Sequence, residues 1–166
     1  MTVMQARIFE TKSGWAAVAS SGQGISQVLM PSKSRAKIER ELEKLCSGEY
    51  EVGKNLIRVE SDIIRYFNGR FVDFSQYPID MTFSTGFDKT VWLAIKDIPY
   101  GKTMTYKEVA EKIGNPNASR AVANALNHNP IPLLLPCHRI LASDGIGGYS
   151  AGVALKKKML QLEGII

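Results

Sequence analysis

Residues 105–139 read TYKEVAEKIGNPNASRAVANALNHNPIPLLLPCHR. The stretch opens with a capping box, in which Thr105 stands at the N-cap of a helix and Glu108 follows three residues later. Apolar residues at helical spacing continue from there, and Gly114-Asn115-Pro116 then turns the chain. The pattern predicts a short helix that ends near residue 114.

A second helix is predicted over residues 117–127, with a buried stripe of Ala121, Val122, Ala125 and Leu126. Two short helices around a turn that contains glycine are typical of a helix-turn-helix, which binds nucleic acid. An ordinary helical hairpin has the same pattern and is at least as frequent. Arg120 on the second helix favours the nucleic-acid interpretation.

The charge distribution points the same way. Residues 1–88 hold eleven basic and eleven acidic side chains, whereas residues 89–166 hold ten and five, so the net charge of +5 lies in the second part. Clustered Lys and Arg favour a polyanionic partner, because they replace counterions along a phosphate backbone. A solvated basic surface is the alternative, and charge alone does not exclude it.

The rest of the chain predicts two small domains, residues 1–81 and 82–166. Strand-like runs at 5–9, 15–19 and 25–30 are separated by Ser and Gly turns and predict a small antiparallel sheet. Helical spacing follows over 34–46, with Ser34 as N-cap, and over 55–67. We therefore expect an α/β N-terminal domain, followed by a mostly α C-terminal domain that starts with a helix over 86–95.

Composition narrows the class further. No apolar stretch approaches membrane-spanning length, and the N-terminus lacks the pattern of a secretory signal. Cys46 and Cys137, with His128 and His138, offer no pair at zinc-site spacing and cannot build a disulfide framework. We expect a soluble intracellular protein without a structural metal.

Pro136-Cys137-His138-Arg139 is the strongest candidate for chemistry. The apolar run 131–135 before it predicts a short buried strand or extended segment, which places Cys137 where core meets surface. A thiol there can be an inert core residue or a nucleophile with His138 as base. Neighbours in an extended segment point in opposite directions, so proton transfer between them needs a bridging water or a local kink. Glu163 is available to orient a histidine from across the fold.

Three other segments border this motif. Asn129-Pro130 predicts a turn that sends the chain toward Cys137. The glycine-rich stretch 145–152 predicts a flexible wall of a binding site. The closing helix, with Leu155, Met159 and Leu162 facing inward, carries Lys156-Lys157-Lys158 on what we expect to be a solvated face, with a phosphate contact as the alternative.

Taken in order, Asn129-Pro130-Ile131-Pro132, Pro136-Cys137-His138-Arg139, Tyr149-Ser150 and Leu162-Glu163-Gly164 resemble the O6-alkylguanine-DNA alkyltransferases, also called methylated-DNA–protein-cysteine methyltransferases. The resemblance is dense over 86–164 and extends to residues 1–80 only in layout. It implies a ribonuclease-H-like N-terminal domain and a winged-helix-like helix-turn-helix in the C-terminal one.

The resemblance also implies single-use repair, in which the alkyl group of O6-alkylguanine in DNA passes to the protein's own Cys137; O4-alkylthymine stays open as a second substrate. By this resemblance we expect His138 to deprotonate Cys137 through a water, Glu163 to orient His138, and Asn129 to hold the active-site turn. Tyr106 matches the tyrosine that, in the family, hydrogen-bonds the guanine and helps turn the nucleotide out. A stacked base cannot present its alkyl carbon to a buried thiol, so extrusion is required.

For DNA the resemblance implies a minor-groove helix-turn-helix, with Arg120 filling the place of the extruded base and small residues at Ala121, Ala123 and Ala125 allowing close approach. Further DNA-contact positions are Lys107, Asn115 and Ser143. The implied substrate pocket is lined by Leu126, Pro132, Tyr149, Ser150 and Ala151. No cofactor and no metal are implied, the partner is double-stranded DNA, and we expect a monomer in the cytoplasm, or in the nucleus if the source is eukaryotic.

The sequence departs from the family pattern at Ala151-Gly152, where the usual pattern is Gly-Gly. The extra methyl predicts weaker reaction with bulky O6-benzylguanine than with methyl adducts. Two rival hypotheses stay open from the residues themselves. One is a non-catalytic DNA-binding module with a structural Cys137, and the other is a cysteine hydrolase that uses Cys137 and His138.

Overall fold

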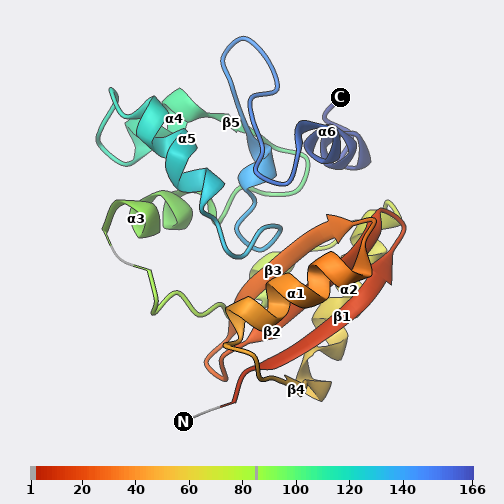
Figure 1. The fold of residues 1–166 in the computed structure, drawn as a ribbon. Coiled ribbons are helices and arrows are strands. Elements are labelled where there is room, and N and C mark those ends of the chain that lie inside the picture. Colours follow the sequence, from red (N-terminus) through yellow and green to blue (C-terminus); the bar gives the residue numbers. More distant parts are fainter. Residues whose placement is uncertain (1–2, 85) are drawn as a thin grey trace. The chain divides into compact units, whose positions relative to one another are not determined.

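The computed structural model describes residues 3–84 and 86–166. Contacts divide the chain into two compact units, Met1–Asp80 and Met81–Ile166, which Figure 1 shows as a sheet with helices and a mainly helical group. The sequence predicted a boundary between residues 81 and 82.

Unit 1 is built on a four-stranded sheet. Strands β1 (Gln5–Thr11), β2 (Gly14–Ser20) and β3 (Ile25–Ser32) form the predicted antiparallel meander. The short strand β4 (Glu51–Val52) pairs with β1 in parallel, so the strand order is β3-β2-β1-β4 and the sheet is mixed. The prediction of a purely antiparallel sheet was therefore wrong, because a two-residue strand carries too little pattern to be found in sequence.

Two amphipathic helices accompany this sheet, α1 (Arg35–Leu45) and α2 (Ile57–Phe67), the second preceded by the 3₁₀ turn η1 (Lys54–Leu56). The predicted N-cap is confirmed, since the amide of Lys37 donates to the Ser34 side chain at 3.2 Å. The apolar side of α1 packs on the sheet through a cluster of buried side chains: Ala6, Ala17, Ala19, Ile38, Leu42 and Cys46. A further 3₁₀ turn, η2, spans Phe74–Gln76.

Unit 2 contains four helices among its described residues: α3 (Gly86–Ile95), α4 (Tyr106–Lys112), α5 (Ser119–Asn127) and α6 (Val153–Leu162). The predicted capping box is present, because the Glu108 amide donates to Thr105 Oγ1 at 3.1 Å and the Thr105 amide to Glu108 Oε2 at 2.7 Å. Trp92 Nε1 donates to the Ala125 carbonyl at 2.9 Å and so joins α3 to α5. Strands β5 (Met104–Thr105) and β6 (Ile140–Leu141) pair in parallel.

The phase of α5 corrects part of the sequence prediction. Val122, Ala125 and Leu126 are buried as predicted, whereas Ala121 is exposed. Ala125 is fully buried against α3 and therefore does not belong to an outer face that approaches DNA. The buried side runs through residues 118, 122, 125 and 126, which is one face of a helix. Ala121 and Ala123 are left on the accessible side.

The run Ile131–Leu135 is buried as predicted, but it is a turn and not a strand. The Leu135 amide donates to the Ile131 carbonyl at 2.9 Å, and Leu133 has a left-handed φ of 73°. Prolines at 130, 132 and 136 have no amide hydrogen, so the segment has too few donors to pair in a sheet. The chain therefore reaches Cys137 through a compact turn.

The described residues contain neither a helix that could span a membrane nor a cluster of metal-binding side chains. No described helix has both the length and the apolar character that a membrane crossing requires. Among residues 3–84 and 86–166, no group of three or more His, Cys, Asp or Glu side chains is arranged to hold a metal ion.

Candidate active site

Cys137 begins a single turn of 3₁₀ helix, η3 (Cys137–Arg139), directly after Pro136. Its amide donates to the Leu135 carbonyl at 2.7 Å, and the residue is only 5% exposed. The chain is therefore bent at Cys137 and His138, not extended, and the objection that the two side chains must point apart no longer applies. Proton transfer between the two side chains was predicted to need a bridging water or a local kink, and this turn is such a kink.

Asn129 closes the turn that leads to Cys137. Its Nδ2 donates to the Leu135 carbonyl at 2.7 Å, and its Oδ1 accepts the Ile131 amide at 2.9 Å. Burial raises the pKa of the Cys137 thiol, while hydrogen bonds with Asn129 and Tyr149 and the positive charge of Lys156 act in the opposite direction. Asn129 thus both fixes the backbone and favours the thiolate.

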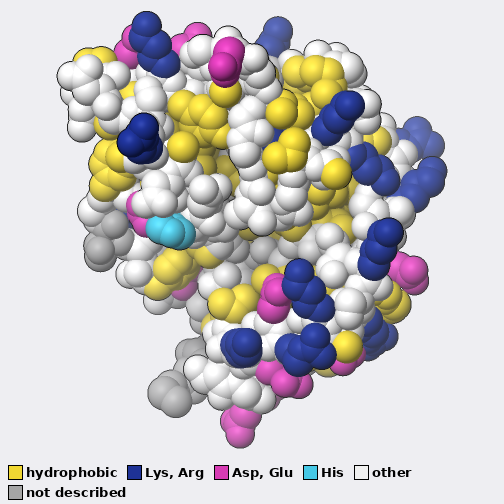
Figure 2. All heavy atoms as spheres, turned by 45° about the horizontal axis from the view of Figure 1, so that its top comes forward, with side chains coloured by type: hydrophobic (Ala, Val, Ile, Leu, Met, Phe, Trp, Pro, Cys, Tyr) yellow, Lys and Arg dark blue, Asp and Glu magenta, His cyan; other side chains and the backbone are white. Residues whose placement is uncertain are grey.

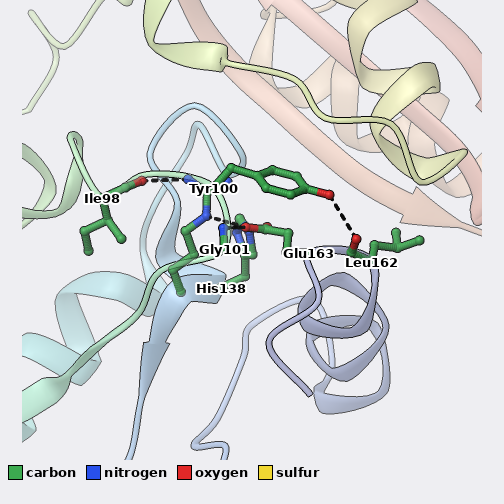
Figure 3. A network of polar contacts seen from close by, with 7 residues as sticks. Ile98, Tyr100, Gly101, His138, Leu162 and Glu163 are labelled. Carbon is green, nitrogen blue, oxygen red and sulfur yellow. Dashed lines mark hydrogen bonds and ion pairs between the residues drawn. The ribbon is translucent and has the colours of Figure 1, made fainter.

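A buried polar network is centred on His138, the residue that follows Cys137, and on Glu163 (Figure 3). His138 Nε2 and Glu163 Oε2 are 2.5 Å apart, and both side chains are fully buried. The second carboxylate oxygen of Glu163 accepts from Arg139 Nε at 2.8 Å and from the Gly101 amide at 3.0 Å. Figure 3 shows that Glu163, which ends α6, reaches between His138 and the segment at Gly101. The network joins three stretches that are distant in sequence.

The bonds around Tyr100 and Arg139 hold the outer part of the same network. Arg139 Nη1 donates to the Ile98 carbonyl at 2.7 Å, and its guanidinium lies 5.9 Å from the ring centre of Tyr100. Tyr100 Oη donates to the Leu162 carbonyl at 2.9 Å, beside Glu163 (Figure 3). The carboxylate therefore has little freedom to move.

Burial and the charges around His138 and Glu163 determine the protonation state of His138. Burial acts to raise the pKa of Glu163, but the hydrogen bonds with His138 and Arg139 and the positive charge of Arg139 prevail and leave that pKa at about 2. Burial lowers the pKa of His138, although Glu163 opposes the shift. A neutral imidazole that donates Nε2–H to a carboxylate carries its lone pair at Nδ1. The arrangement therefore gives His138 the protonation state of a general base.

Lys156 is a site residue that sequence analysis missed. It was predicted on a solvated face with Lys157 and Lys158, yet its side chain is completely buried, whereas those two are exposed. Its Nζ donates to the Ile140 carbonyl at 2.6 Å and to the Gly148 carbonyl at 3.0 Å. Helical spacing could have predicted this burial, because Lys156 lies on the same helical face as Met159, Leu160 and Glu163, which are all buried.

The glycine-rich loop approaches α4 through Tyr106, which is half-buried. Tyr106 Oη donates to the Gly148 carbonyl at 3.4 Å. At Gly147 the φ is +75°, and a Cβ there would lie 2.7 Å from the Tyr106 hydroxyl, so this position requires glycine. The loop was predicted to be a flexible wall; at Gly148 it is held by both Tyr106 and Lys156.

The remaining predicted pocket and DNA positions differ in exposure. Leu126 and Pro132 are buried, Tyr149 is half-buried, and Ser150 and Ala151 are exposed at the end of the loop. The predicted DNA-contact residues are all exposed and come from α4, the turn after it, α5 and the turn that follows β6: Lys107, Asn115, Arg120 and Ser143. Figure 2 shows Lys and Arg side chains on both sides of an apolar area in the upper half of the view.

Comparisons with known proteins agree with this site. Residues 86–165 match the DNA-binding domain of 6-O-methylguanine DNA methyltransferase. A methylated-DNA–protein-cysteine methyltransferase of Methanosarcina acetivorans is 53% identical over 81 residues, which are 48% of this chain and 52% of that protein. The match therefore spans about half the length of that relative.

A protein of the same name from Metallosphaera sedula is 41% identical over 120 residues, which cover 72% of this chain and 75% of that relative. Among solved structures, the O6-methylguanine methyltransferase of Mycobacterium tuberculosis has a TM-score of 0.77 at 29% identity, and the alignment covers 96% of this chain and 92% of that one. The resemblance seen in sequence is thereby confirmed: the chain belongs to the methylated-DNA–protein-cysteine methyltransferase family.

Proposed function

We propose that this protein repairs alkylated DNA by transferring the alkyl group from the O6 atom of guanine to Sγ of its own Cys137. The observation that carries the proposal is a buried thiol that directly precedes a histidine held by a buried carboxylate. A thiolate is a soft nucleophile suited to attack on a saturated carbon. Family membership supports the same reaction.

The reaction begins with removal of the thiol proton. His138 takes that proton at Nδ1 through a water, and Glu163 stabilises the imidazolium that forms, since its carboxylate accepts from Nε2. Arg139 and the Gly101 amide hold the carboxylate in place, so little reorganisation is needed as the charge develops. The products of this step are a thiolate and a charged His138–Glu163 pair.

In the transfer itself, the bond between sulfur and the alkyl carbon forms as the bond between that carbon and O6 breaks. The electron pair of the broken bond stays on guanine, which takes a proton from water and becomes the normal base, while the charged His138 returns its proton to water. Tyr106, which contacts Gly148 of the glycine-rich loop, hydrogen-bonds the departing guanine and so stabilises the negative charge that develops on it. The thioether is stable, and we expect each molecule to react once.

Delivery of the base requires extrusion from the duplex. We assign DNA binding to a winged-helix-like helix-turn-helix of α4 and α5 that enters the minor groove, with Arg120 occupying the place of the extruded nucleotide. Ala121 and Ala123 lie on the accessible side of α5 and permit close approach. Lys107, Asn115 and Ser143 would contact the backbone, and the excess of basic residues beyond residue 88 supports this assignment.

The other parts of the proposal concern the whole protein. It acts as a monomer without a cofactor, on O6-alkylguanine in double-stranded DNA, in the cytoplasm or, in a eukaryote, the nucleus. Unit 1 is a ribonuclease-H-like scaffold domain that precedes the catalytic domain, with residues 1–81 and 82–166 as their extents. Sheet order β3-β2-β1-β4, with the parallel strand at one edge, supports that description.

The test is a single-turnover reaction with a duplex oligonucleotide that carries one O6-methylguanine, followed by intact-mass and peptide analysis. We expect one methyl group per protein molecule, mapped to Cys137. Cys137→Ser abolishes the transfer, and the matched variant Cys46→Ser, in the other unit, retains it. A label on Cys46, or turnover beyond one equivalent, contradicts the proposal. DNA binding without any label favours the non-catalytic module.

A further inference from the structure

The ammonium group of Lys156 is buried without an acidic partner. The side chain has no exposed surface, and both of its hydrogen bonds go to backbone carbonyl oxygens, those of Ile140 and Gly148. Among residues 3–84 and 86–166, no carboxylate forms an ion pair with it. A buried charge is expensive unless something compensates it. Carbonyl dipoles compensate this one only in part, so a functional reason is needed for its position.

Lys156 connects the parts of the site that must act together. Ile140 follows the acceptor turn η3, and Gly148 belongs to the glycine-rich loop. The ammonium also lies 5.8 Å from the ring centre of Tyr106, and the Tyr106 hydroxyl donates to the same Gly148 carbonyl. One side chain on α6 thus fixes the loop and the tyrosine of α4 relative to the segment that carries Cys137.

Its charge also acts on the acceptor. The titratable groups that face Lys156 are Cys137 and His138 from η3 and Tyr106 from α4, while Glu163 on its own helix is engaged by His138 and Arg139. The Lys156 charge acts to lower the pKa of the Cys137 thiol, against the effect of burial. Reciprocally, burial lowers the pKa of Lys156 to about 8, and Cys137 acts to raise it.

We propose that Lys156 is a positioning residue for alkyl transfer, which holds Gly148 and Tyr106 at the acceptor and stabilises the thiolate form of Cys137 by its charge. This inference rests on the proposed function for its biological meaning. The physical coupling between Lys156 and Cys137 does not, because it concerns the thiol itself and exists without DNA.

The experiment compares Lys156→Met with Lys156→Arg and with Lys157→Met. Met has similar length and no charge, Arg keeps the charge, and Lys157 is an exposed neighbour on the same helix. Two rates are measured across a range of pH: single-turnover methyl transfer from a methylated duplex, and alkylation of Cys137 by iodoacetamide without DNA. Peptide mapping separates Cys137 from Cys46, and circular dichroism verifies that each variant is folded.

We expect Lys156→Met to slow iodoacetamide alkylation of Cys137 about tenfold near neutral pH and to displace its pH profile upward by about one unit, the equivalent of that factor. Lys156→Arg restores most of the rate, and Lys157→Met reproduces the original profile. Methyl transfer falls by at least the same factor in Lys156→Met, because loop and tyrosine are also released.

Two outcomes overturn the inference: a Lys156→Met profile that superimposes on the original, or a loss of rate without displacement of the profile, which means a structural role only. Failure of the proposed function gives a different result. In that case the unaltered protein takes no methyl group from DNA, while the iodoacetamide profiles of the Lys156 variants still differ as expected.

Discussion

Replacement of Glu163 by Gln is the perturbation for which the structure gives the clearest magnitude. Gln has the same shape but no charge, so Arg139, only 6% exposed, loses its counter-charge while keeping its place. His138 also faces an amide instead of a carboxylate. Removing one partner of a buried ion pair costs about 3–5 kcal/mol, because the other charge stays buried. We expect the free energy of unfolding to fall by that amount near neutral pH.

The pKa of Glu163 gives a second measure of the same interactions. Its value of about 2 in the folded protein lies well below the ordinary value of 4.5 for a glutamate side chain, a difference that corresponds to about 3 kcal/mol. A folded-state pKa below the unfolded one means that the stabilisation is fully present above about pH 4.5 and is lost as the pH falls toward 2. The difference in free energy of unfolding between the original protein and Glu163→Gln should therefore be constant near neutral pH and become smaller in acid.

The assay is urea unfolding at several pH values, followed by tryptophan fluorescence. The chain has two tryptophans, and a Trp15→Phe background leaves Trp92, which is buried in the same unit as Glu163. Glu111→Gln, an exposed carboxylate on α4, is the matched control and should change stability little. The reasoning is refuted if the difference in free energy of unfolding between the original protein and Glu163→Gln is below about 1 kcal/mol near neutral pH, or if it is unchanged near pH 3.

Two further predictions concern substrates. Arg120→Ala, at an exposed position of α5, should slow single-turnover repair of duplex DNA about tenfold. The melting temperature and the reaction of Cys137 with iodoacetamide should stay the same. An unchanged rate with duplex DNA argues against a role of Arg120 in extrusion. The unaltered protein should react more slowly with O6-benzylguanine than with methyl adducts, and Ala151→Gly should narrow that ratio in a competition assay. Equal rates for the two substrates in the unaltered protein contradict the effect assigned to the Ala151 methyl.

Features that depend on neighbouring residues were predicted correctly from sequence. The N-caps at Ser34 and Thr105 are set by side chains that bond amides three residues away, so a short stretch contains all the information. The helix over 86–95 and the meander of unit 1 were found for the same reason, because their apolar spacing and turn residues are local.

Features that depend on distant partners were not predictable in this way. Lys156 was predicted to be solvated because three consecutive lysines are usually exposed. Its partners, the carbonyls of Ile140 and Gly148, are brought to it only by the folded structure. Likewise, Glu163 was available to orient a histidine, but nothing in the sequence pairs it with Arg139 or with Gly101, 62 residues away. The chemistry of the site came from residue types and resemblance, and its precise bonding only from the fold.

The turn before Cys137 has a consequence for how the molecule opens. The amides of Ile131, Leu135, Cys137 and Arg139 all donate hydrogen bonds inside this buried segment, and three prolines restrict its backbone. Solvent reaches such amides only when the surrounding core separates, so their hydrogen exchange is tied to opening of the whole unit. The segment that carries the acceptor, although it consists of a turn and a single turn of 3₁₀ helix, therefore shares the kinetic protection usually associated with a core strand.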